Sequence, residues 1–217
     1  MTKQQPKVIL LDAVGTLFNV RGSVGEVYSA FAQKFGVRVP ANKLNEAFYH
    51  AFASVDPPAF PGIPPEEIPL CEFEWWRVIA LRTFQQVGVL SEFADFTDFF
   101  DHLYNYFATA EPWFVYSDIL PALEQWRRTG IQLGIVSNFD SRIYLVLKEL
   151  KLEEFFLSVT ISTETGFAKP EPQIFAIALA KHHCNPQNAW YIGDSFNEDY
   201  QGAKAAGLRG ILLKRNN

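Results

Sequence analysis

The stretch Val8-Ile-Leu-Leu-Asp-Ala-Val-Gly-Thr-Leu17 decides the fold class of this chain. Its first four residues form a continuous apolar run, which predicts a short strand buried on both faces of a parallel sheet. The run ends in Asp12, and Gly15 follows in a predicted turn. Ligands of open α/β sheets bind at the carboxyl ends of the strands, so Asp12 is the first candidate site residue.

The same pattern of an apolar run ending in polar residues returns in the second half of the chain. Strands are predicted at residues 131–136 and 189–192, with weaker copies at 156–161 and 210–213. The segments between them have helical spacing of apolar residues, at 118–128, 141–150, 173–181 and 198–206. This alternation predicts an α/β fold with a doubly wound, Rossmann-like parallel sheet.

Aromatic residues concentrate in the part of the chain between these two regions. They make up 15% of the sequence, and 21 of the 33 fall in residues 17–115. Their spacing predicts helices at 25–35, 44–52, 73–86 and 93–107. Residues 56–69 hold six of the 13 prolines, which predicts an extended loop there. We therefore expect an all-helical domain, residues 18–111, inserted into a core of residues 1–17 and 112–217.

Composition excludes several classes of function. The formal net charge is -5 and no run of Lys or Arg occurs, so nucleic acid is not an expected partner. No apolar run reaches the roughly 18 residues that span a bilayer, so we expect no membrane association. The N-terminal residues show no signal-peptide pattern, and Cys71 and Cys184 are too few for a disulfide framework. A cytoplasmic location is the expectation.

Polar side chains follow three of the predicted strands. They are Asp12, Ser137, and the pair Asp194 and Asp199, while Lys169 lies in a loop before the predicted strand at 189–192. Carboxylates that converge on one place repel each other, and a bound cation relieves the repulsion. Oxygen ligands point to Mg²⁺, and Lys169 with Ser137 would complete a cradle for an anion. The chemistry that fits is phosphoryl transfer to a carboxylate, followed by hydrolysis.

This set of motifs resembles the haloacid dehalogenase-like (HAD) hydrolases over nearly the whole chain. Residues 12–17 look like the first motif of the family, Ser137 the second, Lys169 the third, and Gly193-Asp194 with Asp199 the fourth. The helical insert resembles the type-one cap of the family, in subfamily I. The start at Asp12-Ala-Val-Gly-Thr-Leu-Phe18 and the pair Trp75-Trp76 resemble the branch named after a rhythmically expressed insect gene.

The resemblance implies a role for each motif residue. Asp12 would be the nucleophile, and Lys169 would neutralise it and the transferring group. Mg²⁺ would be held by Asp12, Asp194 and the backbone carbonyl of Val14, with Asp199 either a further ligand or a partner of the ligands. Ser137 would bind the substrate phosphate, and Asn138 would add a donor or a substrate contact. Read singly, Ser137-Asn138 also suits a helix N-cap, and Asp199 a cap of the last helix.

The sequence departs from the family at the second position after the nucleophile. Phosphatases of the family carry there a second Asp, which protonates the leaving group, whereas this chain has Val14. A valine cannot move protons, and loss of a general acid typically slows a reaction by roughly 10²–10⁴-fold.

Three functions remain open at this point. The first is a Mg²⁺-dependent hydrolase of a small phosphorylated metabolite that either has a good leaving group or receives a proton from an acid of the helical insert or of the substrate. The second is a weakly active or inactive binding or scaffold protein of HAD fold. The third is a 2-haloacid dehalogenase, since those relatives also lack the second Asp; they do not use the Gly-Asp…Asp metal motif. The sequence predicts neither the substrate nor the oligomeric state.

Overall fold

The computed structural model describes residues 5–215, which divide into two compact units. The first unit contains the described residues up to Asn19, the segment Pro58–Ile68, and the chain from Val115 onward. The second contains Val20–Pro57 and Pro69–Phe114. The sequence predicted that residues 18–111 form one insert, whereas the structure assigns Pro58–Ile68, within that range, to the first unit. There a Cβ on Gly166 would approach Pro61 Cα to 2.9 Å, so the proline-rich loop packs directly on the first unit.

The first unit is built on a five-stranded parallel sheet in the order β5-β4-β1-β6-β7. The strands are β1 (Val8–Leu11), β4 (Gln132–Ser137), β5 (Ser158–Ile161), β6 (Ala189–Gly193) and β7 (Arg209–Leu212). Strand β1 is central and fully buried, as its apolar run predicts. Its register places Leu11 between Ile135 of β4 and Ile192 of β6, so the residues that follow these three strands meet at one edge. The predicted α/β class with a parallel sheet is confirmed.

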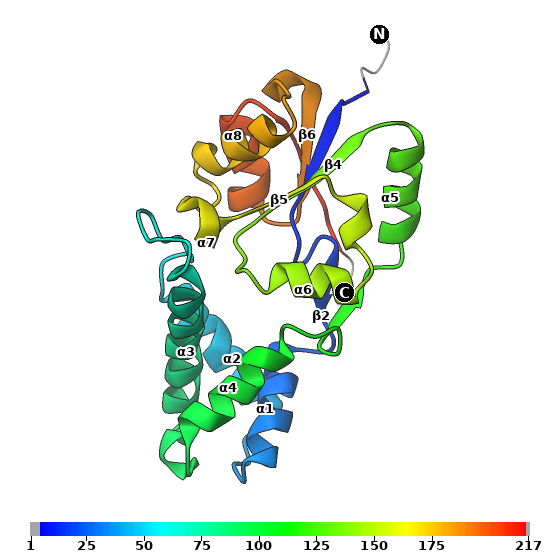
Figure 1. The fold of residues 1–217 in the computed structure, drawn as a ribbon. Helices are drawn as coiled ribbons and strands as arrows, with labels where there is room; N and C mark the ends of the chain where they lie inside the picture. The colour runs from blue at the N-terminus through cyan, green and yellow to red at the C-terminus, as the bar shows by residue number, and fades with distance from the viewer. Residues whose placement is uncertain (1–4, 216–217) are drawn as a thin grey trace. The chain divides into compact units, whose positions relative to one another are not determined.

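Helices cover both faces of this sheet, with α5 on one side and α8 on the other (Figure 1). The helices are α5 (Ile119–Arg128), α6 (Ile143–Glu149), α7 (Ser162–Thr165), α8 (Pro172–Lys181) and α9 (Gly202–Ala205). Shorter turns are η2 (Glu153–Phe155), η3 (Pro186–Asn188) and the π-helical η4 (Phe196–Gln201). The single helix expected at 198–206 is thus divided, with a π-helical turn before α9.

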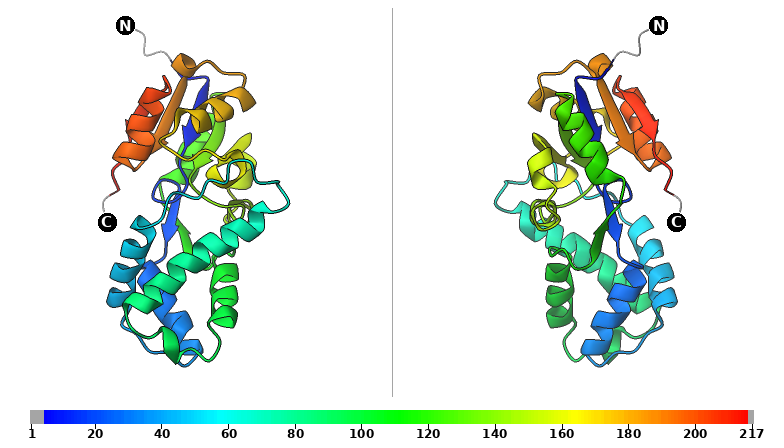
Figure 2. Two further views of the ribbon diagram at one scale, coloured as in Figure 1. Left: turned by 90° about the vertical axis from the view of Figure 1, so that its left-hand side faces the viewer. Right: turned by 90° about the vertical axis from the view of Figure 1, so that its right-hand side faces the viewer.

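The second unit consists of helices, whose ribbons Figure 2 shows from two sides, and these helices pack around an aromatic core. The helices are α1 (Val24–Lys34), α2 (Ala41–Ala53), α3 (Ile68–Gln86) and α4 (Phe96–Tyr106), with the turn η1 (Leu90–Glu92). Each lies within a few residues of a predicted helix. Ser23 and Glu26 form a reciprocal capping box that starts α1. The chain crosses between the units in the short paired strands β2 (Phe18–Val20) and β3 (Trp113–Val115).

Within residues 5–215, no helix is both long enough and apolar enough to cross a membrane.

Candidate active site at the carboxyl edge of the sheet

Asp12 lies directly after β1, at the edge where the three central strands end. Its side chain is buried, and two groups from distant parts of the chain bind the same oxygen. The Ser137 hydroxyl donates to Oδ1 at 3.0 Å, and Lys169 Nζ donates to Oδ1 at 2.7 Å. Within the described residues no hydrogen bond reaches Oδ2. The carboxylate is therefore fixed through one oxygen, while the other is available for chemistry.

Two glycines allow the acidic side chains to approach one another. Gly15 has φ +87°, and a Cβ there would overlap the Asp194 carboxylate. A Cβ on Gly193 would overlap the Asp199 carboxylate in the same way. As a result, one carboxylate oxygen from each of Asp12, Asp194 and Asp199 lies within 4.8 Å of the other two.

Both carboxylate oxygens of Asp199 accept hydrogen bonds from neighbouring groups. It lies in the π-helical turn η4 and is 1% exposed. Lys169 Nζ donates to its Oδ1 at 2.6 Å, and the Ser195 backbone N–H donates to its Oδ2 at 2.9 Å. Of the two roles that the resemblance left open for Asp199, these bonds favour a partner that fixes Lys169. Asp194, in contrast, is exposed, and Thr16 Oγ1 donates to its Oδ1 at 3.3 Å.

Asn138 is used differently from the predicted phosphate contact. Its Oδ1 accepts from the Lys169 backbone N–H at 2.7 Å, and its Nδ2 donates to the Lys169 carbonyl at 3.0 Å. Nδ2 also lies 3.4 Å from Glu198 Oε2. Because both the oxygen and the nitrogen of the carboxamide already form hydrogen bonds, the structure favours a role for Asn138 in holding the backbone of Lys169. Nor do Ser137 and Asn138 cap a helix, since α6 begins only at Ile143.

The turn after Asp12 leaves one backbone carbonyl unused. The backbone N–H groups of Thr16, Leu17 and Phe18 donate to the Ala13 carbonyl, and that of Gly15 donates to Phe18. Among the described residues, none donates to the carbonyl of Val14. This carbonyl could therefore accept a cation, while the Val14 side chain offers no exchangeable proton.

Burial and charge shift the ionisation of the site in a way that suits a cation. Burial, opposed by Lys169 and reinforced by Asp199, raises the pKa of Asp12 to about 6. Burial and then the Asp199 charge also raise the pKa of Asp194. For Lys169, burial would lower the pKa, but the carboxylates of Asp12 and Asp199 outweigh it and raise the pKa. Burial thus disfavours the charged forms of Asp12 and Asp194, and a divalent cation bound to their oxygens would offset this, so these residues fit Mg²⁺.

Two residues of the site were missed or misjudged from the sequence. Tyr191 of β6 was assigned only to a strand, yet its hydroxyl lies 3.0 Å from Lys169 Nζ. A hydroxyl two residues before Gly193 on a buried strand was the available signal. Glu198, expected to be solvated, is half-buried against Asn138, and burial raises its pKa.

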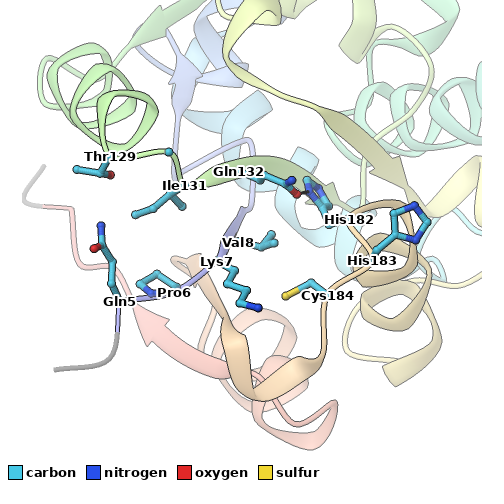
Figure 3. A pocket seen from close by; sticks show the side chains of 11 residues that line it. Gln5, Pro6, Lys7, Val8, Thr129, Ile131, Gln132, His182, His183 and Cys184 are labelled. Atoms are coloured by element: carbon cyan, nitrogen blue, oxygen red, sulfur yellow. Dashed lines mark hydrogen bonds between the residues drawn. The ribbon is translucent and has the colours of Figure 1, made fainter. Parts of the chain in front are cut away.

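A separate pocket of about 420 Å³ lies at the amino ends of β1 and β4, and none of the predicted site residues lines it (Figure 3). His182 at its border is 6% exposed, and its ring nitrogens bond Gln132 Oε1 at 3.0 Å and Ser158 Oγ at 2.7 Å. Burial lowers the pKa of His182, so the neutral ring suits this structural position.

Comparison with known proteins identifies the family of this site. The family model described as haloacid dehalogenase-like hydrolase matches residues 6–207. The chain belongs to the haloacid dehalogenase-like hydrolases. The motifs predicted from the sequence therefore lie in a member of that family. Ser137, Lys169 and Asp194, from the other three motifs, all lie close to Asp12 of the first.

Relatives with known names agree with this membership. The HAD-like hydrolase domain-containing protein 3 of Mus musculus is 34% identical over 96% of this chain and 82% of that protein. The Rhythmically expressed gene 2 protein of Drosophila melanogaster is 27% identical over 95% of this chain and 82% of that protein. Over 46% of this chain and 43% of the relative, the identity with Glyceraldehyde 3-phosphate phosphatase of Methanopyrus kandleri is 37%.

Solved structures show that the fold is shared across different HAD chemistries. A HAD phosphatase from Thermococcus onnurineus matches with a TM-score of 0.64 at 24% identity, over 97% of this chain and 87% of that one. A dehalogenase with an intermediate complex matches with a TM-score of 0.72 at 16% identity, over all of this chain and 88% of that one. The fold alone does not choose between these reactions, so the side chains of the site must decide.

Proposed function

We propose that this HAD-like hydrolase is a Mg²⁺-dependent phosphohydrolase that acts on a small phosphorylated metabolite through an aspartyl-phosphate on Asp12. The observation that carries the proposal is the convergence of a fixed carboxylate, a buried lysine and two further acids at one edge of the sheet. The cation-binding acids favour a phosphatase over a dehalogenase, and the partial match to a glyceraldehyde 3-phosphate phosphatase supports phosphatase activity on a small molecule. The expected cytoplasmic location remains part of the proposal.

The proposed reaction has two steps. Asp12 attacks phosphorus, and the bond from phosphorus to the leaving oxygen breaks with its electron pair going to the leaving group. Water then attacks phosphorus, and the bond from phosphorus to the Asp12 oxygen breaks with its electron pair returning to the carboxylate. The protons of the water leave on inorganic phosphate, which restores Asp12. Lys169 balances negative charge beside the reacting atoms throughout. Asp12, Asp194 and the Val14 carbonyl would hold Mg²⁺, which when bound neutralises the carboxylates and the phosphoryl oxygens.

Val14 narrows the class of substrate. With no acid at that position, the leaving group must depart without a proton from this turn. Acyl, enol and aryl phosphates leave readily as anions, so they are the expected substrates.

The proposal is tested with p-nitrophenyl phosphate, whose leaving group needs little help from an acid. We expect turnover that requires Mg²⁺ and that Asp12→Asn abolishes, because the carboxamide is not a nucleophile. Asp101→Asn, an equivalent change on the exposed face of α4, is the matched control and should retain full activity.

Other outcomes would support the competing functions. Activity that persists in Asp12→Asn would remove Asp12 as the nucleophile. Halide release from 2-haloacids without Mg²⁺ would support a dehalogenase. Failure to bind Mg²⁺, together with no turnover across a broad panel of phosphorylated metabolites, would support a binding or scaffold protein.

A further inference from the structure

Tyr191 is held rigidly by the core of the first unit. It lies in β6 and is fully buried at 0% exposure. Its ring packs edge-on against Phe175 of α8, with 5.1 Å between ring centroids. Because the ring is enclosed by apolar neighbours, the position of its hydroxyl is fixed by packing rather than by the site itself.

The hydroxyl of Tyr191 reaches three polar groups of the site. It lies 3.0 Å from Lys169 Nζ, 3.0 Å from Asp199 Oδ1 and 2.9 Å from the carbonyl of Val136. A phenol has one hydrogen to donate and also accepts, so it donates to Val136 or Asp199 and accepts from the lysine. The hydroxyl therefore connects β6 with the end of β4 and with the loop that carries Lys169.

With Tyr191 included, each hydrogen of the Lys169 ammonium has an acceptor. The ammonium carries three N–H donors, and the three acceptors are Asp12 Oδ1, Asp199 Oδ1 and the Tyr191 hydroxyl. These three contacts, together with the lysine side chain itself, restrain the position of Nζ, and loss of the phenol would leave one N–H donor without an acceptor. Two hydrogen bonds with the Asn138 carboxamide hold the backbone of Lys169.

The neutrality of the third acceptor matters for charge. Asp12 and Asp199 already place two negative charges on one ammonium. A third carboxylate would leave a more negative surrounding for an incoming phosphate, whereas a phenol orients the lysine and adds no charge.

From this geometry we propose that Tyr191 is a positioning residue that directs the Lys169 ammonium to Asp12. The inference rests on the proposed phosphohydrolase function for its kinetic consequences, but the placement of Nζ can be measured without turnover. It assigns a function in this site to a strand residue outside the four motifs.

The kinetic test uses Tyr191→Phe, which removes the hydroxyl and keeps the ring. We expect kcat for p-nitrophenyl phosphate to fall about tenfold, with KM changed less than about twofold, because a hydrogen bond to a charged group is lost. Tyr200→Phe is the matched control, since the Tyr200 ring stacks on Phe196 and its hydroxyl has no hydrogen bond among the described residues. Thermal unfolding of both variants shows whether folding is retained.

A double-mutant cycle separates positioning of the lysine from a general structural effect. In a Lys169→Met background, Tyr191→Phe should lower kcat/KM and the affinity for inorganic phosphate with Mg²⁺ by less than about twofold. An equal drop in both backgrounds, or no drop in the single variant, would overturn the inference.

A crystal structure of Tyr191→Phe separates this inference from the proposed function. We expect Lys169 Nζ to move away from Asp12 Oδ1, and an unmoved Nζ would overturn the positioning role. If the wild-type protein neither turns over nor binds phosphate, the proposed function fails, and the crystal structure still decides the position of Nζ.

Discussion

At the scale of single residues, Asp12 shows how the site sets its own chemistry. The carboxylate is buried next to a lysine and two acids, and burial is the largest influence on its pKa. The neighbouring Lys169 does not fully offset burial and the Asp199 charge, so Asp12 ionises less readily than a free aspartate and a bound cation would favour its ionised form. This links the protonation of one residue to the binding of Mg²⁺.

The raised pKa of Asp12 predicts a pH-dependent stability of the metal-free protein. Because the folded state binds this proton more tightly than the unfolded chain, the stabilising effect is full below the ordinary pKa of 3.8 and is lost as pH rises through about 6. In EDTA, wild-type stability relative to Asp12→Asn should therefore fall between pH 4 and pH 7. Urea unfolding of both proteins across this range measures the difference. Saturating Mg²⁺ should flatten the pH dependence, and an unchanged slope with the metal would contradict it.

Val14 gives a prediction of the opposite sign, a gain of activity. Val14→Asp places a proton donor two residues after the nucleophile, and we expect turnover of alkyl phosphates to rise at least tenfold, toward the roughly 10²–10⁴-fold that a positioned general acid contributes. Val14→Asn introduces a side chain of similar size and polarity to aspartate, but its carboxamide is not a general acid. It should give no gain in turnover. Steady-state kinetics on an alkyl and an aryl phosphate measure both effects. Equal rates for the two variants would mean that another group supplies the proton.

At the scale of elements, the site depends on how closely the loop after β6 approaches the strand. Gly193 ends β6, and the space that its side chain would fill is occupied by the Asp199 carboxylate from η4. Asp199 in turn bonds Lys169. A single glycine therefore permits the contact between a strand end and a π-helical turn on which the lysine depends.

Gly193→Ala is expected to disrupt the site through this contact. The added Cβ must displace the Asp199 carboxylate, so kcat should fall at least tenfold and the affinity for Mg²⁺ should weaken. Gly130→Ala is the control, because a Cβ there meets nothing within 4 Å. Its φ of +76° will lower stability by roughly 1–2 kcal/mol while activity stays unchanged. Turnover, calorimetric Mg²⁺ titration and thermal unfolding distinguish the two; full activity of Gly193→Ala would show that Asp199 can relocate.

At the scale of the whole molecule, each of the two units has an apolar core of its own. The core of the helical unit is largely aromatic, and Phe84 is at its centre, fully buried and in ring contact with Tyr28, Phe93 and Phe99. The core of the first unit around α8 consists mainly of aliphatic side chains with Phe175 and Tyr191. The high aromatic content of the chain thus stabilises the helical unit most directly.

Phe84→Ala should therefore lower the free energy of unfolding by about 3–5 kcal/mol, the usual range for a buried phenylalanine. Phe52→Ala is the matched control, because Phe52 is 41% exposed and its loss should have less than half that effect. Chemical denaturation followed by far-UV circular dichroism measures both. Equal effects of the two substitutions would contradict the packing described for Phe84.

The sequence by itself determined the sheet, the helices and most of the site. Apolar runs ending in polar residues marked β1, β4 and β6, because periodicity and strand-end position are local properties of a chain. They placed Asp12, Ser137 and Asp194 at one edge of the sheet, where Lys169 joins them from a loop. The paired β2 and β3 escaped prediction because each has only three residues.

Tertiary structure alone decided how the side chains share their hydrogen bonds. The carboxamide of Asn138 and the hydroxyl of Tyr191 both bind Lys169, although 31 and 22 residues separate them from it along the chain. Likewise, the proline-rich segment Pro58–Ile68 lies with the first unit although helices of the second flank it in sequence. Local sequence carries propensity and burial pattern, but hydrogen-bond partners depend on distances that only the packed sheet and its loops define.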